Sequence, residues 1–195
     1  VDEIIMEEKK LTRAFICVEF PDEVIKEIAR VQELVGKIKF TGKMTELENL
    51  HLTLKFLGEI DDSMIEKVKK NLSKIKFNSF EVKLGKIGIF HFRGKPRIIW
   101  IKVEGKEIYE LQKKIDEALK DLFKKEERFM GHLTIARIKY VKDTKRFEER
   151  ISKIAVGKIK FKINKFKLKS SELRRTGPVY RDLEIYGTEA VSYTH

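Results

Sequence analysis

Two kinds of hydrophobic spacing alternate along this chain, and they occur twice in the same order. Apolar residues first run almost without interruption, over 14–18 and again over 98–103, which is typical of buried strands. Each run is followed by apolar residues three or four positions apart, which form one face of a helix. We expect the first helix to begin at Pro21-Asp22, with Asp22 as its N-cap. The helical positions are Val24, Ile28, Val31 and Val35 in the first half, and Ile108, Leu111, Ile115, Leu119 and Leu122 in the second.

The same order continues towards the end of each half. A second strand leads into another helix, which Asp61-Asp62-Ser63 begins in the first half and Asp143-Thr144 in the second. A β-rich segment follows over 80–90 and over 158–168. The segment 179–187 then indicates one added strand. Each half is therefore β-α-β-α-β.

This repeat predicts an α/β (α+β) fold with two lobes related by a pseudo-twofold axis. Each lobe is expected to be a sheet with helices on its outer side, and the lobes to enclose a central cleft. We expect a single bilobal domain over 11–187, with lobes of about 11–90 and 91–187 and the final strand as a candidate to cross over. The termini, 1–10 and 188–195, are expected to be flexible.

Two short polar motifs lie at equivalent points of the repeat. They are His51-Leu52-Thr53-Leu54 and His132-Leu133-Thr134-Ile135. Because a strand alternates its faces, each His shares a face with the Thr two positions on, and the apolar residues face the core. A pseudo-twofold axis would bring the two histidines to face each other across the cleft.

A pair of opposed imidazoles suits acid–base catalysis of phosphoryl transfer. Imidazole titrates near pH 6.5, so one ring can be protonated while the other is neutral. One ring would activate water and the other would protonate the leaving oxygen, in line through phosphorus. Thr53 and Thr134 could donate hydrogen bonds to the remaining phosphate oxygens. The sequence has no zinc-type ligand spacing and no nucleophile elbow, so we predict no metal site and no cofactor.

The charge of the chain adds one candidate partner. With 43 Lys and Arg against 31 Asp and Glu, the net charge is +12, which indicates a polyanionic partner such as RNA, a thermophilic composition, or both. The lone Cys17 is interpreted as a small buried hydrophobe. We find no apolar segment of membrane-spanning length and no signal peptide, so we expect a cytoplasmic monomer that does not bind membranes.

Longer stretches around the two motifs resemble the two-histidine phosphoesterases, specifically the RNA 2′,3′-cyclic phosphodiesterases, also called 2′-5′ RNA ligase-like proteins. The resemblance covers nearly all of 11–187. One departure is His91, where relatives often have Pro. The five matching segments are Arg13-Ala14-Phe15-Ile16, 49–58, 87–100, 131–137 and Gly177-Pro178-Val179-Tyr180.

The resemblance implies metal-free hydrolysis of a terminal 2′,3′-cyclic phosphate on RNA to a 2′-phosphate. It makes His51 the proton donor to the ribose 3′ oxygen and His132 the proton acceptor from water, with Thr53 and Thr134 holding the phosphate. The residues by themselves do not assign these two roles. The expected partners are RNA ending in a 2′,3′-cyclic phosphate or small cyclic nucleotides. Two alternatives stay open: a 2′-5′ RNA ligase that uses the same residues, and a non-catalytic protein that binds RNA ends.

Three further residues are candidates for substrate binding. Lys55 shares the face of the first His–Thr pair if strict alternation continues. Arg137 lies three positions beyond Thr134, so it reaches the cleft only if the strand ends or bulges there. Tyr180 follows a Gly-Pro turn and could stack on a base.

Other notable side chains are given structural interpretations. Phe15 and Trp100 are expected in the core, and His91 in solvent. Alternation over 158–169 predicts one strand with a cationic face, which either guides RNA to the cleft or faces solvent. The nearby Arg174 and Arg175 favour the first of these.

Overall fold

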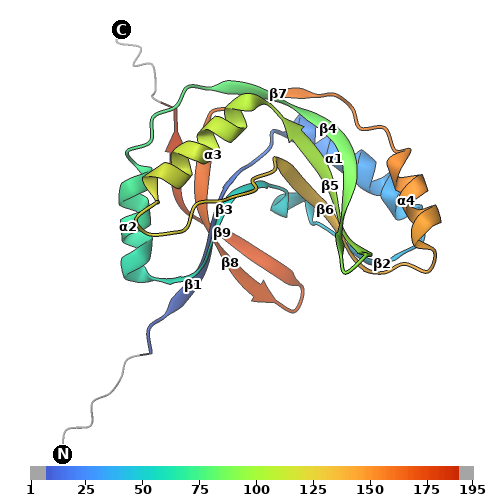
Figure 1. Cartoon of the computed structure of the whole chain (residues 1–195), viewed down its shortest axis with the longest axis horizontal. Helices are drawn as coiled ribbons and strands as arrows, with labels where there is room; N and C mark the ends of the chain where they lie inside the picture. Colours follow the sequence, from blue (N-terminus) through green and yellow to red (C-terminus); the bar gives the residue numbers. More distant parts are fainter. Residues whose placement is uncertain (1–7, 189–195) are drawn as a thin grey trace, which may run out of the picture.

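The computed structural model describes residues 8–188, which form two antiparallel sheets and four α-helices (Figure 1). Sequence expectations for 1–7 and 189–195 lie outside the described residues. The first sheet has the order β3 (Leu52–Asp61), β1 (Leu11–Val18), β8 (Lys165–Arg174) and β9 (Gly177–Gly187). The second sheet has the order β2 (Thr41–Met44), β6 (His132–Tyr140), β5 (Lys95–Glu104), β4 (Phe80–Phe92) and β7 (Lys160–Ile163). The predicted fold class, α+β with two sheets, is confirmed.

The four helices cover the sheets in pairs. Helices α2 (Asp62–Leu72) and α3 (Lys106–Ala118) pack on β3 of the first sheet. Helix α1 (Asp22–Gly36) packs on β6 and α4 (Thr144–Ser152) on β4 of the second sheet. Thus α1 and α3 each pack on a motif strand of the other repeat. In Figure 1, α2 and α3 lie to the left and α4 to the right.

The helix starts were predicted with one error. Asp61 caps α2 and Asp143 caps α4, since their carboxylates accept hydrogen bonds from the backbone N–H of Met64 (2.8 Å) and Arg146 (3.1 Å). Asp22 is not the N-cap of α1; Pro21 is, and Asp22 is the first helical residue. A carboxylate there is favoured by the helix dipole without closing a cap.

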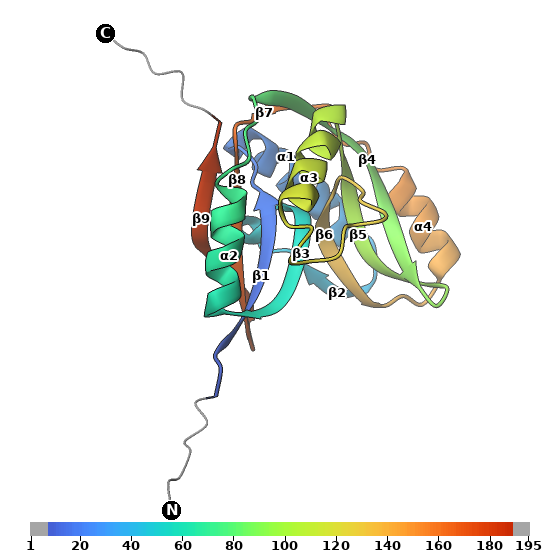
Figure 2. The same cartoon turned by 60° about the vertical axis from the view of Figure 1, so that its left-hand side comes forward.

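Each sheet contains strands from both repeats, so the sheets do not follow the expected division near residue 90. The last strand of the first repeat, β4, pairs with β5 in the second sheet. The corresponding strand of the second repeat, β8, pairs with β1 in the first sheet. Figure 2 shows the first sheet to the left and the second to the right, with β7 at the top. The two repeats are therefore interlocked by an exchange of strands.

The single strand expected over 158–169 is wrong. The chain divides at Asn164, so that β7 pairs with β4 and β8 pairs with β1. Buried residues fall at odd positions before the break, Phe161 and Ile163, and at even positions after it, Phe166 and Leu168. This change of phase was visible in the sequence and marks the crossing between sheets.

Candidate active site

Both His–Thr pairs line one cavity, with a volume of about 470 Å³, between the two sheets. His51 directly precedes β3 and Thr53 lies on it, whereas His132 and Thr134 lie on β6. Leu52, Leu54, Leu133 and Ile135 are buried in the core on the opposite face. The predicted convergence of the two motifs is therefore present.

The two imidazoles are oriented in the same way by the backbone. His51 Nδ1 lies 2.8 Å from the carbonyl oxygen of Asn49, and His132 Nδ1 lies 2.8 Å from that of Met130. A carbonyl oxygen only accepts, so Nδ1 carries the proton in both rings. Nε2 is thus the ring nitrogen that gains or loses a proton, as an acceptor in the neutral ring and a donor in the cation.

Thr53 adds a second contact to the first imidazole. Its Oγ1 lies 2.9 Å from His51 Nε2, and the hydroxyl donates when the ring is neutral. When His51 is protonated, Nε2 donates instead, and the O–H group of Thr53 can point its hydrogen towards the cavity. Protonation of His51 therefore prepares Thr53 to donate to an anion.

Aromatic rings surround both histidines. The His51 ring lies 4.9 Å from that of Phe15 and 5.3 Å from that of Tyr180. The His132 ring lies 4.9 Å from that of Phe90 and 6.4 Å from that of Trp100. These contacts restrict the orientation of each imidazole.

The core assignment is confirmed for Phe15, which is 4% exposed and also contributes to the cavity wall. The core assignment of Trp100 needs correction. Trp100 is half-buried beside His132, and its Nε1 has no hydrogen-bond partner among residues 8–188. Gly88 faces Trp100 across the strand pair, and a Cβ there would lie 2.3 Å from the indole. The glycine thus makes room for the indole next to the catalytic candidate.

Burial lowers the pKa of His51 below 6.5, because desolvation disfavours the imidazolium. The hydrogen bond to Asn49 acts in the opposite direction, and the positive charges of Lys169 and Arg137 lower the pKa further. His51 is therefore neutral at pH 7 in the free protein. A bound anion would raise its pKa again.

Two equivalent β-bulges determine which residues follow the motifs into the cavity. In the β1–β3 pairing, Thr53 lies opposite Cys17 and Lys55 opposite Ile16, so Leu54 is the extra residue. In the β5–β6 pairing, Thr134 lies opposite Trp100 and Ala136 opposite Ile99, so Ile135 is the extra residue. An extra residue reverses the faces of the residues that follow it, up to the next irregularity in the pairing.

The first bulge removes Lys55 from the cavity, so its expected place beside the substrate is wrong. Lys55 is 3% exposed and its Nζ lies 2.5 Å from Asp116 Oδ1 on α3. The ammonium also donates to the carbonyl oxygen of Lys124, at 2.8 Å. Asp116 accepts further bonds from the side chain of Gln112 and the backbone N–H of Glu126, both at 3.0 Å. Lys55 is a structural cation.

The second bulge brings Arg137 into the cavity wall, as its prediction required. Gln32 of α1 holds this bulge: its Nε2 donates to the carbonyl oxygens of Ile135 (3.0 Å) and Thr45 (2.9 Å). The Arg137 side chain makes no hydrogen bond or ion pair with another residue in 8–188, so its guanidinium is available to an anion. Tyr180, also predicted, lines the cavity beside His51.

Several cavity residues were not identified from the sequence. Arg13 lies two positions before Phe15 on β1, and strand alternation could have revealed it. Phe56 occupies the place expected for Lys55, with the Arg13 guanidinium 4.8 Å from its ring centre. Lys43, from the short strand β2, also lines the cavity, and no local pattern indicates it.

The remaining residues singled out from the sequence do not line the cavity. His91 is exposed to solvent, as expected, and its Nε2 is also hydrogen-bonded to Glu148. Lys167 and Lys169 form ion pairs with Glu19 and Asp182, so β8 has no free cationic face at these positions. Burial raises the pKa of the Cys17 thiol to about 12, which keeps it protonated.

Two other features are absent from the part of the chain that the structure describes. In 8–188, no three His, Cys, Asp or Glu side chains are grouped so that they could hold a metal ion. No helix in the same range is long and apolar enough to cross a membrane.

The known proteins that this chain resembles agree with one another in their names. The family model described as LigT like Phosphoesterase matches the chain twice, over residues 18–100 and 101–180. A Methanocaldococcus jannaschii protein named RNA 2′,3′-cyclic phosphodiesterase is 38% identical over 172 residues, which cover 86% of this chain and 96% of the relative. A Thermotoga maritima protein of the same name is 34% identical over 177 residues, covering 88% and 92%.

A solved structure agrees with these relatives. The crystal structure of the protein TT0787 of Thermus thermophilus superimposes with a TM-score of 0.78 at 25% identity, over 90% of this chain and 97% of that chain. The two matches of the family model correspond to the two repeats, and each contains one His–Thr motif. The chain therefore belongs to the LigT-like phosphoesterase family.

Proposed function

We propose that this protein hydrolyses 2′,3′-cyclic phosphate ends of RNA to 2′-phosphates, without a metal ion, by paired acid–base catalysis. The observation that carries the proposal is the shared cavity of His51 and His132, in both of which Nδ1 is bonded to a carbonyl oxygen and Nε2 is the nitrogen that can exchange a proton. The names of the relatives, RNA 2′,3′-cyclic phosphodiesterase, support the same reaction.

The proposed reaction is one in-line displacement at phosphorus. His132 Nε2 accepts a proton from water as the water oxygen forms a bond to phosphorus. The bond from phosphorus to the ribose 3′ oxygen breaks, and His51 Nε2 gives its proton to that oxygen. The products are a 2′-phosphomonoester and a free 3′ hydroxyl. Proton exchange with solvent then restores both rings.

The other cavity residues would bind the phosphate. Thr53 and Thr134 donate hydrogen bonds to its non-bridging oxygens, and Arg137 supplies a positive charge next to them. Tyr180 offers an aromatic face for the terminal base. Because one chain supplies every residue in this wall, we also propose that the protein works as a monomer.

The depressed pKa of His51 fits the role of proton donor only with substrate bound. In the free protein the ring is neutral at pH 7. The negative charge of the cyclic phosphate, next to Nε2, favours the imidazolium and raises the pKa. Substrate binding would therefore favour the protonated form of His51, which a proton donor must have.

Turnover of a 2′,3′-cyclic mononucleotide in excess EDTA tests the proposal, with the product identified by phosphorus NMR. We expect a 2′-phosphate, and a loss of about 10²–10⁴-fold in kcat for either His51→Ala or His132→Ala. Tight binding without turnover would instead identify a protein that binds RNA ends. Joining of a cyclic phosphate end to a 5′ hydroxyl would identify the 2′-5′ ligase.

An activated diester separates the two roles. Bis(4-nitrophenyl) phosphate has a leaving group that departs without a proton, so the variant that lacks the acid should recover most of its activity on it. We expect recovery for His51→Ala and none for His132→Ala. The reverse result would exchange the two assignments.

A further inference from the structure

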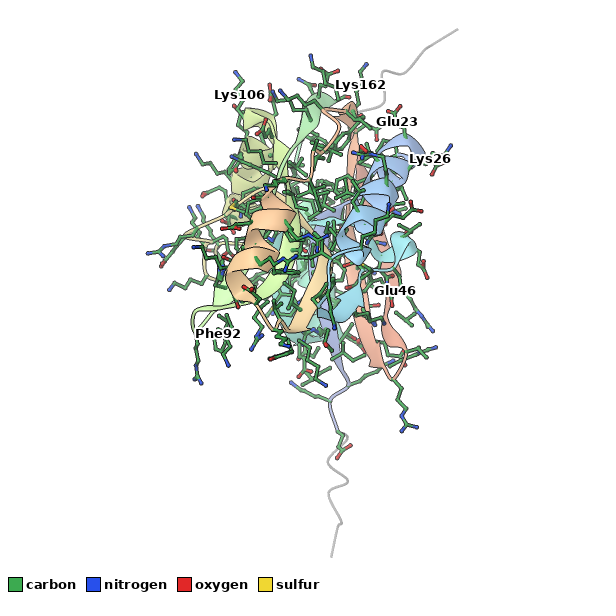
Figure 3. The ribbon with its side chains drawn as sticks, turned by 90° about the vertical axis from the view of Figure 1, so that its right-hand side faces the viewer. Glu23, Lys26, Glu46, Phe92, Lys106 and Lys162 are labelled. Atoms are coloured by element: carbon green, nitrogen blue, oxygen red, sulfur yellow. The ribbon has the colours of Figure 1, made fainter. Side chains whose placement is uncertain are left out.

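Two grooves follow the edge of the second sheet next to the cavity, and neighbouring members of this series share lining residues. Lys43 and Arg137, which are register partners on β2 and β6, line both the cavity and the first groove. Thr41 lines that groove and also the second one, which extends to α4. Figure 3 looks onto this side of the molecule, with α4 in front and Glu46, which follows β2, to its right. We call the two grooves together the β2–α4 track.

The β2–α4 track is strongly positive. Arg97 and Lys139 line its first part, and Lys39, Lys142, Arg146 and Arg150 line its second part. None of these six side chains forms an ion pair with another residue of the described chain. The acidic residue in its lining, Asp143, already accepts the backbone N–H of Arg146 as the cap of α4. A polyanion in the track would therefore meet six cations that have no carboxylate partner among the described residues, next to Lys43, whose ammonium is paired with Glu46.

Aromatic surface lies among these charges. Tyr140 is 61% exposed at the end of β6, opposite Thr41 in the register. Phe40 and Phe147 form the floor of the second part, with their ring centres 5.6 Å apart. Cations spaced along a groove and an exposed aromatic ring are the two components that bind single-stranded nucleic acid.

We propose that the β2–α4 track binds the single-stranded RNA segment that precedes the cyclic phosphate end. This deepens the proposed function and rests on it for the position of the end. A 2′,3′-cyclic phosphate can form only on the last ribose of a strand, so every other nucleotide lies on its 5′ side. With the terminal phosphate between His51 and His132, the backbone leaves the cavity past Arg137 and Lys43. Tyr140 then stacks on a base further along the strand.

Binding of a labelled RNA hexanucleotide with a 3′-phosphate tests this proposal without any turnover. The variant Lys139→Ala/Lys142→Ala/Arg146→Ala removes three exposed cations outside the catalytic cavity. We expect its Kd to rise about 10- to 100-fold near 0.1 M salt, and the slope of log Kd against log salt to fall by about 2. Hydrolysis of a 2′,3′-cyclic mononucleotide, which is too short to reach the track, should be unchanged.

The matched control is Lys67→Ala/Lys70→Ala/Lys74→Ala, which removes the same charge at and just beyond α2, on the opposite side of the molecule (Figure 1). An equal rise in Kd for the control, or no rise for the track variant, would overturn the proposal. Tyr140→Ala should weaken hexanucleotide binding about 5- to 100-fold, whereas Tyr140→Phe should not. If the protein turned over no cyclic phosphate, the proposed function would fail. The binding measurement would still show whether the β2–α4 track binds single-stranded RNA.

Discussion

At the scale of single residues, the group bonded to Nδ1 of each imidazole decides which ring nitrogen can exchange a proton. The carbonyls of Asn49 and Met130 fix Nδ1 as the protonated nitrogen in both rings. For His51, burial lowers the pKa most, and the positive charge of Lys169 on β8 lowers it further. That lysine is paired with Glu19 and Asp182, so its charge acts together with two carboxylates. The charged neighbours of His51 thus lie outside its own motif.

Replacing Lys169 by Met should raise the pKa of His51. The substitution removes a positive charge that opposes the imidazolium and leaves Glu19 and Asp182 with one cation fewer. NMR titration of the His51 ring protons would measure the change, with Lys162→Met on β7 as the control. If His51 is the acid, the high-pH limb of kcat/KM should move upward in the same variant. A pKa that stays constant or decreases would contradict this account.

At the scale of elements, the bulges in β3 and β6 decide which side chains reach the cavity. Both follow the Thr of their motif by one residue, and helices of the opposite repeat hold them with buried polar groups. Helix α1 supplies Gln32 to the second bulge, and α3 supplies Asp116 to Lys55 beyond the first. The bulge after each motif therefore explains why Arg137 enters the cavity and why Lys55 does not.

Breaking the Lys55–Asp116 pair from one side should be costly. Lys55→Met leaves a buried carboxylate without its cation, which we expect to lower the free energy of unfolding by about 3–5 kcal/mol. Adding Asp116→Asn removes the second charge and keeps an oxygen for Gln112 and Glu126, so most of the loss should be recovered. Urea unfolding of the wild type, both single variants and the double variant measures the coupling. Additive losses would show that the two side chains are energetically independent.

At the scale of the whole molecule, the exchange of strands makes the two repeats depend on each other. Neither sheet can form from one repeat, because β4 completes the second sheet and β8 completes the first. The cavity lined by both His–Thr pairs lies between these two sheets and takes one histidine from each side. Its geometry is therefore a property of the complete chain.

This arrangement predicts a single cooperative unfolding transition. Trp100, the only tryptophan of the sequence, lies on β5, so its fluorescence reports on the second sheet. Far-UV circular dichroism reports on both sheets together. We expect the two signals to give the same urea midpoint. Two separate midpoints would show that the sheets unfold independently.

Local pattern predicted much of this fold and site. The helical faces of α1 and α3, the caps Asp61 and Asp143, and the His–Thr alternation depend on residues close in sequence. The break between β7 and β8 at Asn164 could also have been predicted, because the apolar positions change there from odd to even numbers. Arg13 could have been placed beside Phe15 by the same rule.

The sequence by itself determined that each half would present one imidazole and one hydroxyl on a polar strand face, because alternation along a strand is a local consequence of backbone geometry. Only the tertiary structure decided where that alternation breaks, because a bulge exists only in the pairing of two strands that lie far apart in the sequence. The exchange of β4 and β8, the neutralised Lys169 and the entry of Lys43 from β2 have the same origin. Each is set by contacts between distant segments, to which a local pattern carries no signal.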